Sequence, residues 1–237
     1  VLRQAEGSWQ RSAPDPWRSL ADSRVLVVGY GGIGRALARR LLACECEVVA
    51  VASRDRDGDG LVDRVHGIDR LPELLPAADV VVLAVPDVAL GAVSQQVVPL
   101  MKDGGVLLTL DPAASYAGLL AQREGVHQAC AHPAHPSIFL ERTTPEEWAD
   151  TFGGIAAPQE VVAAYEGEDE RIREIVAQVI RAIYAPVIDV HWVSVKQLAQ
   201  LEPTLVETTG CMIGQFRSEE HSLNSSHVAL SRMPSSA

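Results

Sequence analysis

The feature of the chain that most limits its fold is a glycine-rich loop between an apolar run and a helical pattern. Residues 25–28 are continuously apolar, and residues 33–42 have apolar side chains at helical spacing. The loop between them, Gly29-Tyr30-Gly31-Gly32-Ile33-Gly34, matches the fingerprint GxGxxG. The first glycine of that fingerprint permits a tight turn, the second lets a diphosphate approach the backbone, and the third lets helix and strand pack closely. The pattern predicts a dinucleotide at the N-terminus of this helix, where free N–H groups favour an anion.

The alternation of apolar strands and helices continues along the chain. Apolar runs predict further strands at residues 48–52, 80–85, 106–110, 126–130, 160–165 and 186–190. Helical spacing predicts helices at residues 72–75, 88–100 and 169–183, and at 195–215 with an interruption at Pro203. Buried strands that alternate with helices form parallel sheets with right-handed crossovers. The expected fold class is therefore α/β, a Rossmann-type doubly wound parallel sheet followed by the start of a truncated helical domain.

Changes in composition divide the chain into four parts. Residues 1–20 are expected to form an irregular N-terminal arm, and residues 21–192 a dinucleotide-binding domain with an extended sheet. Residues 193–216 are expected to begin a helical domain for dimerisation and substrate binding. From residue 217 the sequence changes to serine, histidine, asparagine and glutamate, and it resembles translated adaptor sequence. We interpret residues 217–237 as a non-native tail.

Composition restricts the partners of the chain. A formal net charge of −11 over 237 residues argues against nucleic acid or an anionic membrane as the main partner. No stretch approaches the ~18 apolar residues of a membrane span, and no signal peptide is visible. The four cysteines form no CxxC pair and are interpreted as reduced residues of a cytoplasmic protein. We expect a small-molecule hydroxy-acid substrate, and a homodimer formed through the apolar face of the last helix.

The residues after the second predicted strand bear on the choice between NAD and NADP. An NAD site typically has an acidic side chain there for the ribose hydroxyl, whereas this chain has Ser53-Arg54-Asp55-Arg56. A hydroxyl and a guanidinium suit a 2′-phosphate, so NADP is favoured over NAD, although Asp55 could still bind a ribose. A solvated charged loop is the alternative. The expected cofactor-binding residues are Gly29, Tyr30, Gly31, Gly32, Ile33, Gly34, Ser53, Arg54, Val85 and Pro86.

Candidate catalytic residues follow the later strands, where ligands bind in open α/β sheets. Asp111 follows one predicted strand, and His132 and His135 follow the next. A histidine at this edge can take the proton of a hydroxyl, and two histidines three residues apart can alternatively share a metal. The alternative for both histidines is a polar loop without a catalytic role.

Glu202 lies on the apolar stripe of the last predicted helix. A carboxylate there is costly unless it is paired, protonated or bound to a metal; the alternative is an edge residue that reaches solvent. The expected catalytic residues are therefore His132, Glu202 and Asp111. A divalent metal, if present, would bind His132, His135 and Glu202.

Two family resemblances cover different parts of the chain. Residues 8–86, with VLVVGYGGIGRALARRL and VHGIDRLPELLPAADVVVLAVP, resemble the cofactor-binding half of a D-2-hydroxyacid dehydrogenase. Residues 79–214, with LDPAASYAG, HPAHPSIF, FGGIAAPQEVVAAYEG and LEPTLVETTG, resemble the D-apionate oxidoisomerase family, whose C-terminal domain is phosphogluconate-dehydrogenase-like. Both families share the strand at residues 79–86. A natural divergent member and a chimera joined at that strand therefore both stay open.

The second resemblance implies NAD-dependent oxidation of a branched aldonate coupled to carbon rearrangement, with His132 and Glu202 on its motifs. It also implies a helical dimerisation domain that continues beyond residue 214, and an acidic residue where this chain has Ser53-Arg54. The leading hypothesis is an NAD(P)-dependent oxidoreductase acting on a small polyhydroxy acid. One alternative is a D-2-hydroxyacid dehydrogenase of the glyoxylate or hydroxypyruvate reductase type, although the catalytic Arg, Glu and His of that family are missing. Another is a non-catalytic, truncated nucleotide-binding module.

Overall fold

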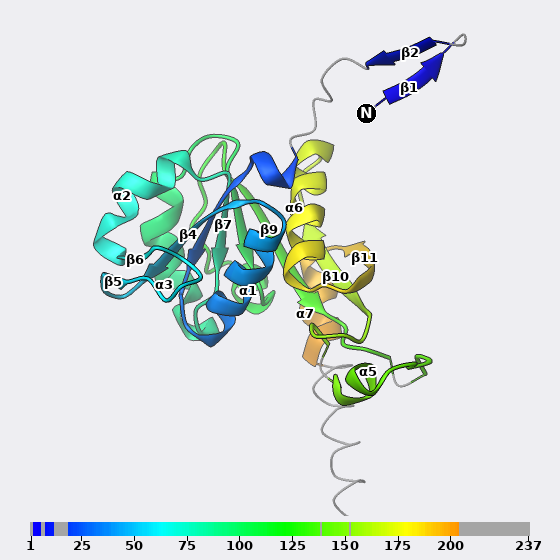
Figure 1. The fold of residues 1–237 in the computed structure, drawn as a ribbon. Helices are drawn as coiled ribbons and strands as arrows, with labels where there is room; N and C mark the ends of the chain where they lie inside the picture. The colour runs from blue at the N-terminus through cyan, green and yellow to red at the C-terminus, as the bar shows by residue number, and fades with distance from the viewer. Residues whose placement is uncertain (1, 6–7, 12–18, 138, 152, 204–237) are drawn as a thin grey trace, which may run out of the picture.

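The computed structural model describes residues 2–5, 8–11, 19–137, 139–151 and 153–203 of the chain, built around one large sheet (Figure 1). The strands of this sheet are β3 (Arg24–Val28), β4 (Glu47–Ala52), β5 (Arg56–Asp57), β6 (Arg64–Gly67), β7 (Val80–Leu83), β8 (Val106–Thr109), β9 (His127–Pro133), β10 (Gln159–Tyr165) and β11 (Val187–Val193). Their spatial order is β11-β10-β9-β8-β7-β3-β4-β6-β5.

The helices are α1 (Gly32–Ala43), α2 (Leu71–Leu74), α3 (Asp87–Val97), α4 (Ala113–Tyr116), α5 (Pro145–Ala149), α6 (Glu170–Ile183) and α7 (Val195–Leu201). They agree with the predicted helices wherever a helix was expected, and α7 corresponds to the start of the helix predicted at residues 195–215. The rest of that helix beyond Pro203, and the predicted tail at 217–237, lie outside the described residues.

The centre of the sheet is parallel, which confirms the predicted fold class. Strand β3 pairs in parallel with β4 and β7, and the parallel pairing continues to β6 on one side and to β8 and β9 on the other. The strand order has a switch point at β3. The next strand in the sequence, β4, lies on one side of β3, and β7 lies on the other. In open α/β sheets such a switch point forms a crevice at the carboxyl edge.

The two ends of the sheet differ from the predicted all-parallel arrangement. Strand β10 is antiparallel to β9, and β11 is then parallel to β10. A parallel neighbour requires a crossover that returns the chain to the opposite edge of the sheet. The segment between β9 and β10 does not cross over, so β10 begins at the edge where β9 ends. At the other end, residues for which no strand was expected form a small antiparallel pair of β5 and β6.

The expectation of an irregular N-terminal arm is also corrected. Strands β1 (Leu2–Ala5) and β2 (Ser8–Arg11) pair with each other in an antiparallel two-stranded sheet. Their sequences carry no apolar run of the kind that identified the other strands, so hydrophobic periodicity did not reveal them.

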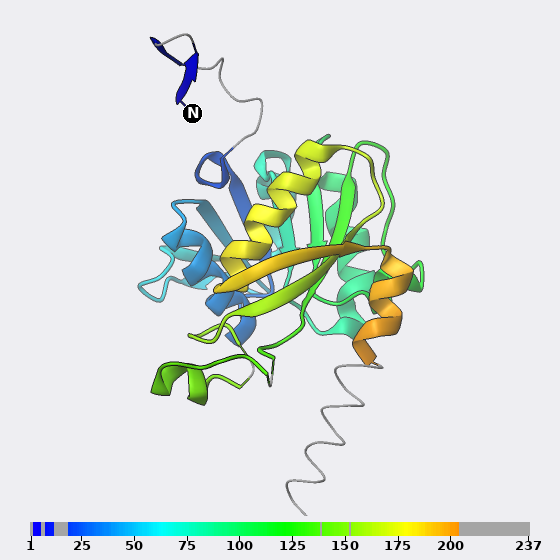
Figure 2. The same ribbon diagram turned by 90° about the vertical axis from the view of Figure 1, so that its right-hand side faces the viewer.

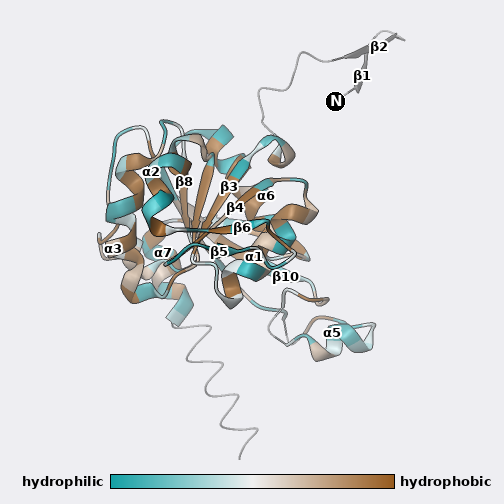
Figure 3. Cartoon of the chain, turned by 60° about the vertical axis from the view of Figure 1, so that its left-hand side comes forward, coloured by the Kyte–Doolittle hydropathy of each residue, from teal (hydrophilic) through white to brown (hydrophobic). Residues whose placement is uncertain are grey.

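Alternate residues of each central strand pack on opposite faces, which explains the continuous apolar runs. On one face, Val25, Val27 and Val82 pack in a cluster with residues of α1 and α6. On the other, Leu26 and Leu83 pack with residues of α2, α3 and α4. The apolar strands accordingly lie between helices that carry both hydrophobic and hydrophilic residues (Figure 3). No helix in the described part of the chain is long and apolar enough to cross a membrane.

Between β9 and β10 the chain makes a long excursion, residues 134–158, which contains α5. It projects from the end of the sheet at which the central strands finish (Figure 2). Two sets of hydrogen bonds order it. A capping box joins Thr144 and Glu147 at the start of α5. The buried carboxylate of Asp150 accepts N–H bonds of 2.9, 2.8 and 3.0 Å from Ile155, Ala156 and Ala157. The excursion therefore has its own hydrogen-bonded structure beside the carboxyl edge.

We expect Asp150→Ala to lower the free energy of unfolding by about 1–3 kcal/mol, because it leaves backbone donors without their acceptor. Burial opposes ionisation of this side chain, but the N–H bonds prevail and hold the pKa of Asp150 below its usual range. The stabilisation is therefore fully present above the unfolded-state pKa of about 4, and is lost as the pH falls through the lower folded-state value. Urea unfolding at pH 7 and at decreasing pH measures both effects. The matched variant Glu146→Ala, exposed on α5, should change stability by less than about 0.5 kcal/mol; an equal loss in both variants would contradict the assignment.

Candidate cofactor and active site

The loop between β3 and α1 is closed on one side by two glycines that allow very close backbone contacts. Gly29 has a φ of +103°, and a Cβ on it would overlap the carbonyl oxygen of Ala84, which follows β7. A Cβ on Gly34 would overlap the carbonyl oxygen of Gly29. These contacts bring strand, helix and the neighbouring strand end together at the switch point of the sheet, as the fingerprint predicted.

The other side of the same loop is open. A Cβ added to Gly31 or Gly32 would meet nothing within 4 Å. Gly31 is the N-cap of α1 and has no side chain to cap the helix, and the first turn carries no acidic residue. Ile33 was expected on the buried stripe of α1, but it is 64% exposed beside this space, whereas Leu37 and Leu41 are buried. Uncapped N–H groups facing an open space form a cradle that suits a diphosphate.

Val85 and Pro86 follow β7 and lie against the glycine loop. The Cγ1 atom of Val85 is 2.9 Å from the point where a Cβ on Gly29 would stand. The structure thus brings the two predicted cofactor-binding segments into contact across the switch point.

Tyr30 lies in the cradle loop, but its side chain points away from the open space. Its ring is buried, and its hydroxyl donates to the carboxylate of Asp59 at 3.3 and 3.4 Å. Its N–H donates to the carbonyl of Val51 at 3.0 Å. Tyr30 therefore holds the loop in place through both its side chain and its backbone N–H group.

At the end of β4 the predicted selectivity residues Ser53 and Arg54 are exposed. The neighbouring carboxylate of Asp55 is 3.3 Å from Nε of Arg64. Burial opposes ionisation of Asp55, but an N–H bond from Gly67 and the charge of Arg64 hold its pKa below the usual range. Arg54 forms no hydrogen bond or ion pair with any residue that the structure describes. The guanidinium of Arg54 is thus available to an anion, while the nearby carboxylate is already engaged.

The ends of β7, β8 and β9 bring three titratable side chains together. Thr109 on β8 is in register with Leu83 on β7 and Cys130 on β9, so Asp111 and His132 follow the paired positions by two residues each. Burial and the charge of Asp111 raise the pKa of Asp87, the first residue of α3, and His132 lowers it. The predicted residues Asp111 and His132 therefore each lie within electrostatic range of Asp87.

Asp87 was missed in the sequence analysis, although its position gave a signal. It follows Val85-Pro86 directly, at the same edge of the sheet as Asp111 and His132. Asp111 itself also has a structural role, since its carboxylate accepts the N–H of Ala113 at 2.7 Å and begins α4.

His132 lies near the end of β9, in register with Val162 of β10, and His135 follows the strand by two residues. Their ring centroids are 6.1 Å apart, and the rings are nearly perpendicular, at 89°. His135 has a φ of +60°, a left-handed conformation that is uncommon outside glycine and often marks functional loops. Within the described ranges, however, no three His, Cys, Asp or Glu side chains are grouped so that they could hold a metal ion. The predicted metal set of His132, His135 and Glu202 is therefore not assembled in this structure.

Glu202 lies at the C-terminal end of α7 and is half-buried. Leu198, one turn earlier, is buried against Cys130 and Ala164 and attaches α7 to β9 and β10. The catalytic role of Glu202 stays a prediction.

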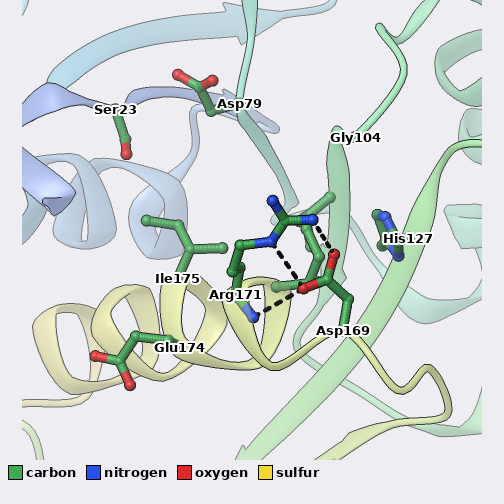
Figure 4. A pocket seen from close by; sticks show the side chains of 10 residues that line it. Ser23, Asp79, Gly104, His127, Asp169, Arg171, Glu174 and Ile175 are labelled. Carbon is green, nitrogen blue, oxygen red and sulfur yellow. Dashed lines mark hydrogen bonds and ion pairs between the residues drawn. The ribbon is translucent and has the colours of Figure 1, made fainter. Parts of the chain in front are cut away.

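A separate pocket lies at the opposite, amino edge of the sheet (Figure 4). It has a volume of about 370 Å³, and its lining includes His127, Asp169 and Arg171. Arg171 donates to Asp169 at 2.9 Å, and this hydrogen bond lowers the pKa of Asp169 to about 2. Arg171 offsets the charge of Asp169, but the lining also carries Asp79 and Glu174, and the pocket lies across the sheet from the cradle. The carboxyl edge remains the candidate site.

Two family models match the chain in different halves. The model of the D-isomer-specific 2-hydroxyacid dehydrogenase NAD-binding domain matches residues 2–110, and that of the C-terminal domain of decarboxylating phosphogluconate dehydrogenase matches residues 140–224. Both parts were expected from the two sequence resemblances.

Several known proteins resemble the chain over most of its length. D-apionate oxidoisomerase from Pectobacterium atrosepticum is 49% identical over 196 residues, which cover 82% of this chain and 69% of the relative. The enzyme of the same name from Cupriavidus necator is 36% identical over 188 residues, covering 78% and 68%. The crystal structure of a semialdehyde dehydrogenase NAD-binding protein from Cupriavidus necator, in complex with calcium and NAD, superposes with a TM-score of 0.71 at 31% identity, covering 90% of this chain and 76% of that one.

An alignment of 196 residues is longer than the whole stretch from Asp79 to the end of the chain. The resemblance to D-apionate oxidoisomerase therefore extends into the cofactor-binding half, beyond the residues 79–214 on which it was first noted. The cradle at the switch point and these matches agree: the chain belongs to the D-apionate oxidoisomerase family and is an NAD(P)-dependent oxidoreductase.

Proposed function

We propose that this chain oxidises a small polyhydroxy acid similar to D-apionate, with His132 as the base that takes the hydroxyl proton. The observation that carries the proposal is the juxtaposition of His132 and Asp111 at neighbouring strand ends, on the edge of the sheet that holds the cofactor cradle. The relatives named D-apionate oxidoisomerase support this substrate class.

NAD(P), when bound, supplies the hydride acceptor. The chain binds its diphosphate at the N-terminus of α1 and the rest of the dinucleotide along the ends of β4 and β7. Nδ1 of His132 is buried, which leaves Nε2 as the nitrogen that exchanges a proton with substrate. The carboxylates of Asp87 and Asp111 favour the positive charge that the imidazole gains, because opposite charges at short range stabilise the ionised form. Asp111 and Glu202 are assigned to substrate hydroxyl groups.

The described side chains do not fit a protein-held divalent cation. His132, His135 and Glu202 are accordingly assigned to proton transfer and substrate binding, and no step of the reaction is derived through a metal.

NADP is the proposed preferred cofactor. Ser53 and Arg54 offer a hydroxyl and an unengaged guanidinium at the end of β4, and Arg64 already holds Asp55. A carboxylate engaged in this way competes poorly for a ribose hydroxyl, whereas a guanidinium binds phosphate with directed, charge-assisted hydrogen bonds.

The proposal includes a homodimer and a cytoplasmic location. Phe139, Trp148 and Ile155 expose 91, 65 and 80% of their surface on the excursion beside the site. Exposed apolar groups of this size support association between copies of the chain.

His132→Ala should lower kcat/KM for D-apionate by about 10²–10⁴-fold, the usual contribution of a general base, with unchanged cofactor affinity. Absorbance at 340 nm with each cofactor measures it, and His191→Ala, on the outer strand β11, is the matched control. Wild-type turnover of glyoxylate or hydroxypyruvate instead of D-apionate would favour a D-2-hydroxyacid dehydrogenase. Cofactor binding without turnover of any hydroxy acid would favour a nucleotide-binding module.

Arg54→Ala should weaken NADP binding by about 10- to 100-fold, equivalent to about 1.5–3 kcal/mol for a hydrogen bond to a charged group. NAD binding should change little, because NAD lacks the 2′-phosphate. Thermal-shift titration with each cofactor tests this, with the exposed Arg39→Ala on α1 as control. An unchanged NADP response in Arg54→Ala would refute the selectivity assignment.

Two glycine substitutions should separate binding from folding. Gly31→Ala points a methyl group into the open cradle, so we expect stability within about 0.5 kcal/mol of wild type and at least a tenfold loss of NAD(P) affinity. Gly34→Ala overlaps backbone and should cost about 1–3 kcal/mol of stability. Calorimetric titration and chemical unfolding distinguish the two. Full cofactor affinity in Gly31→Ala would mean that the diphosphate binds elsewhere.

A further inference from the structure

The hairpin formed by β5 and β6 was not expected from the sequence, and it is attached directly to the cofactor loop. Its turn residue Asp59 accepts N–H bonds from Leu61 at 3.1 Å and Val62 at 3.4 Å, which shape the turn. The same carboxylate also accepts hydrogen bonds from the hydroxyl of Tyr30 and from Nε of Arg35. One side chain thus joins the hairpin to the cradle loop and to the first turns of α1.

The hairpin holds Tyr30 at a second point. Arg56 donates to the carbonyl of Tyr30 at 2.8 Å, and its guanidinium carbon lies 5.9 Å from the centroid of the Tyr30 ring. The ring itself is 4% exposed, in a small cluster with Val62 and Val65 of the hairpin. Tyr30 is therefore fixed by the hairpin at its carbonyl, its ring and its hydroxyl.

The contacts around the hairpin determine which arginine side chain remains available to bind a ligand. Asp59 engages Arg35, and this hydrogen bond is the main reason that the pKa of Asp59 falls to about 2. Tyr30 engages Arg56, and Asp55 engages Arg64. Of the four arginines at positions 35, 54, 56 and 64, only Arg54 forms no such bond within the described part of the chain.

We propose that Asp59 and Tyr30 form a clasp that sets cofactor selectivity, by fixing the segment that carries Arg54 at the distance from the cradle that a 2′-phosphate dinucleotide requires. This proposal rests on the NADP preference proposed above and names the residues that position Arg54. The diphosphate is held by α1 and the 2′-phosphate by the segment after β4, so the separation of these two elements must match the ligand. A loop already ordered at that separation loses less conformational entropy on binding.

Binding of NADPH and NADH, measured by fluorescence titration, tests the clasp without need of turnover. Tyr30→Phe removes the hydroxyl and keeps the ring, and Asp59→Asn removes the charge and keeps an acceptor for the turn. We expect each variant to raise the Kd for NADPH about three- to tenfold and the Kd for NADH less than twofold. The effects of the two substitutions should not add in the double variant, because both weaken the same Tyr30–Asp59 contact. Asp63→Asn, exposed on the same hairpin, is the matched control and should bind both coenzymes as wild type does.

Three results would overturn the clasp. Tighter NADPH binding by Asp59→Asn would mean that the carboxylate acts by repelling phosphate. An equal loss for NADPH and NADH would mean a general structural role. A strong effect of Arg54→Ala with no effect of Tyr30→Phe or Asp59→Asn would mean that Arg54 needs no positioning. If Arg54→Ala itself leaves NADPH binding unchanged, the proposed NADP preference is wrong. The clasp proposal rests on that preference and is then wrong as well.

Discussion

The close backbone contact at the switch point, where Gly34 meets the carbonyl of Gly29 and Gly29 meets that of Ala84, determines how the rest of the site is arranged. It exists only because two positions lack a Cβ, and it pulls the start of α1 onto the ends of β3 and β7. The same geometry leaves Gly31 and Gly32 facing open space. Close packing on one side of the loop and an open cradle on the other are thus two results of one constraint.

The chain reversal after β9 brings the substrate-binding candidates to the cradle. Because β10 runs antiparallel to β9, residues 134–158 leave and re-enter the sheet at its carboxyl edge. His135 and the excursion are therefore held on the same side as Asp87, Asp111 and the glycine loop. A parallel β10 would have required this segment to cross to the amino edge, away from the cofactor.

The sequence predicted those parts of the structure that depend on local pattern. The central strands, α1, α3 and α6 follow from apolar periodicity, and the cradle follows from glycine positions that have few structural alternatives. The hairpin at residues 56–67 was missed because its sequence is polar and glycine-rich, with no alternation to reveal a strand. The antiparallel direction of β10 was missed because periodicity carries no information on strand direction. Asp59 was missed because its partners, Arg35 and Tyr30, are distant in sequence. The neighbourhood of Asp111 and His132 was predictable because Asp111 follows β8 and His132 lies near the end of the adjacent parallel strand β9.

This chain can bind a phosphate only through positive charges close to it, because the net charge of −11 repels an anion at long range. Arg35 and Arg64 are paired with the carboxylates of Asp59 and Asp55, and Arg56 donates to the carbonyl of Tyr30. Among the described residues, Arg54 is the one of these four arginines that forms no such bond. The Arg35–Asp59 pair is partly exposed, and such pairs contribute little to stability. Its consequence is therefore geometric: it fixes where the remaining guanidinium stands relative to the cradle. A contact of small energetic value can in this way decide which dinucleotide fits.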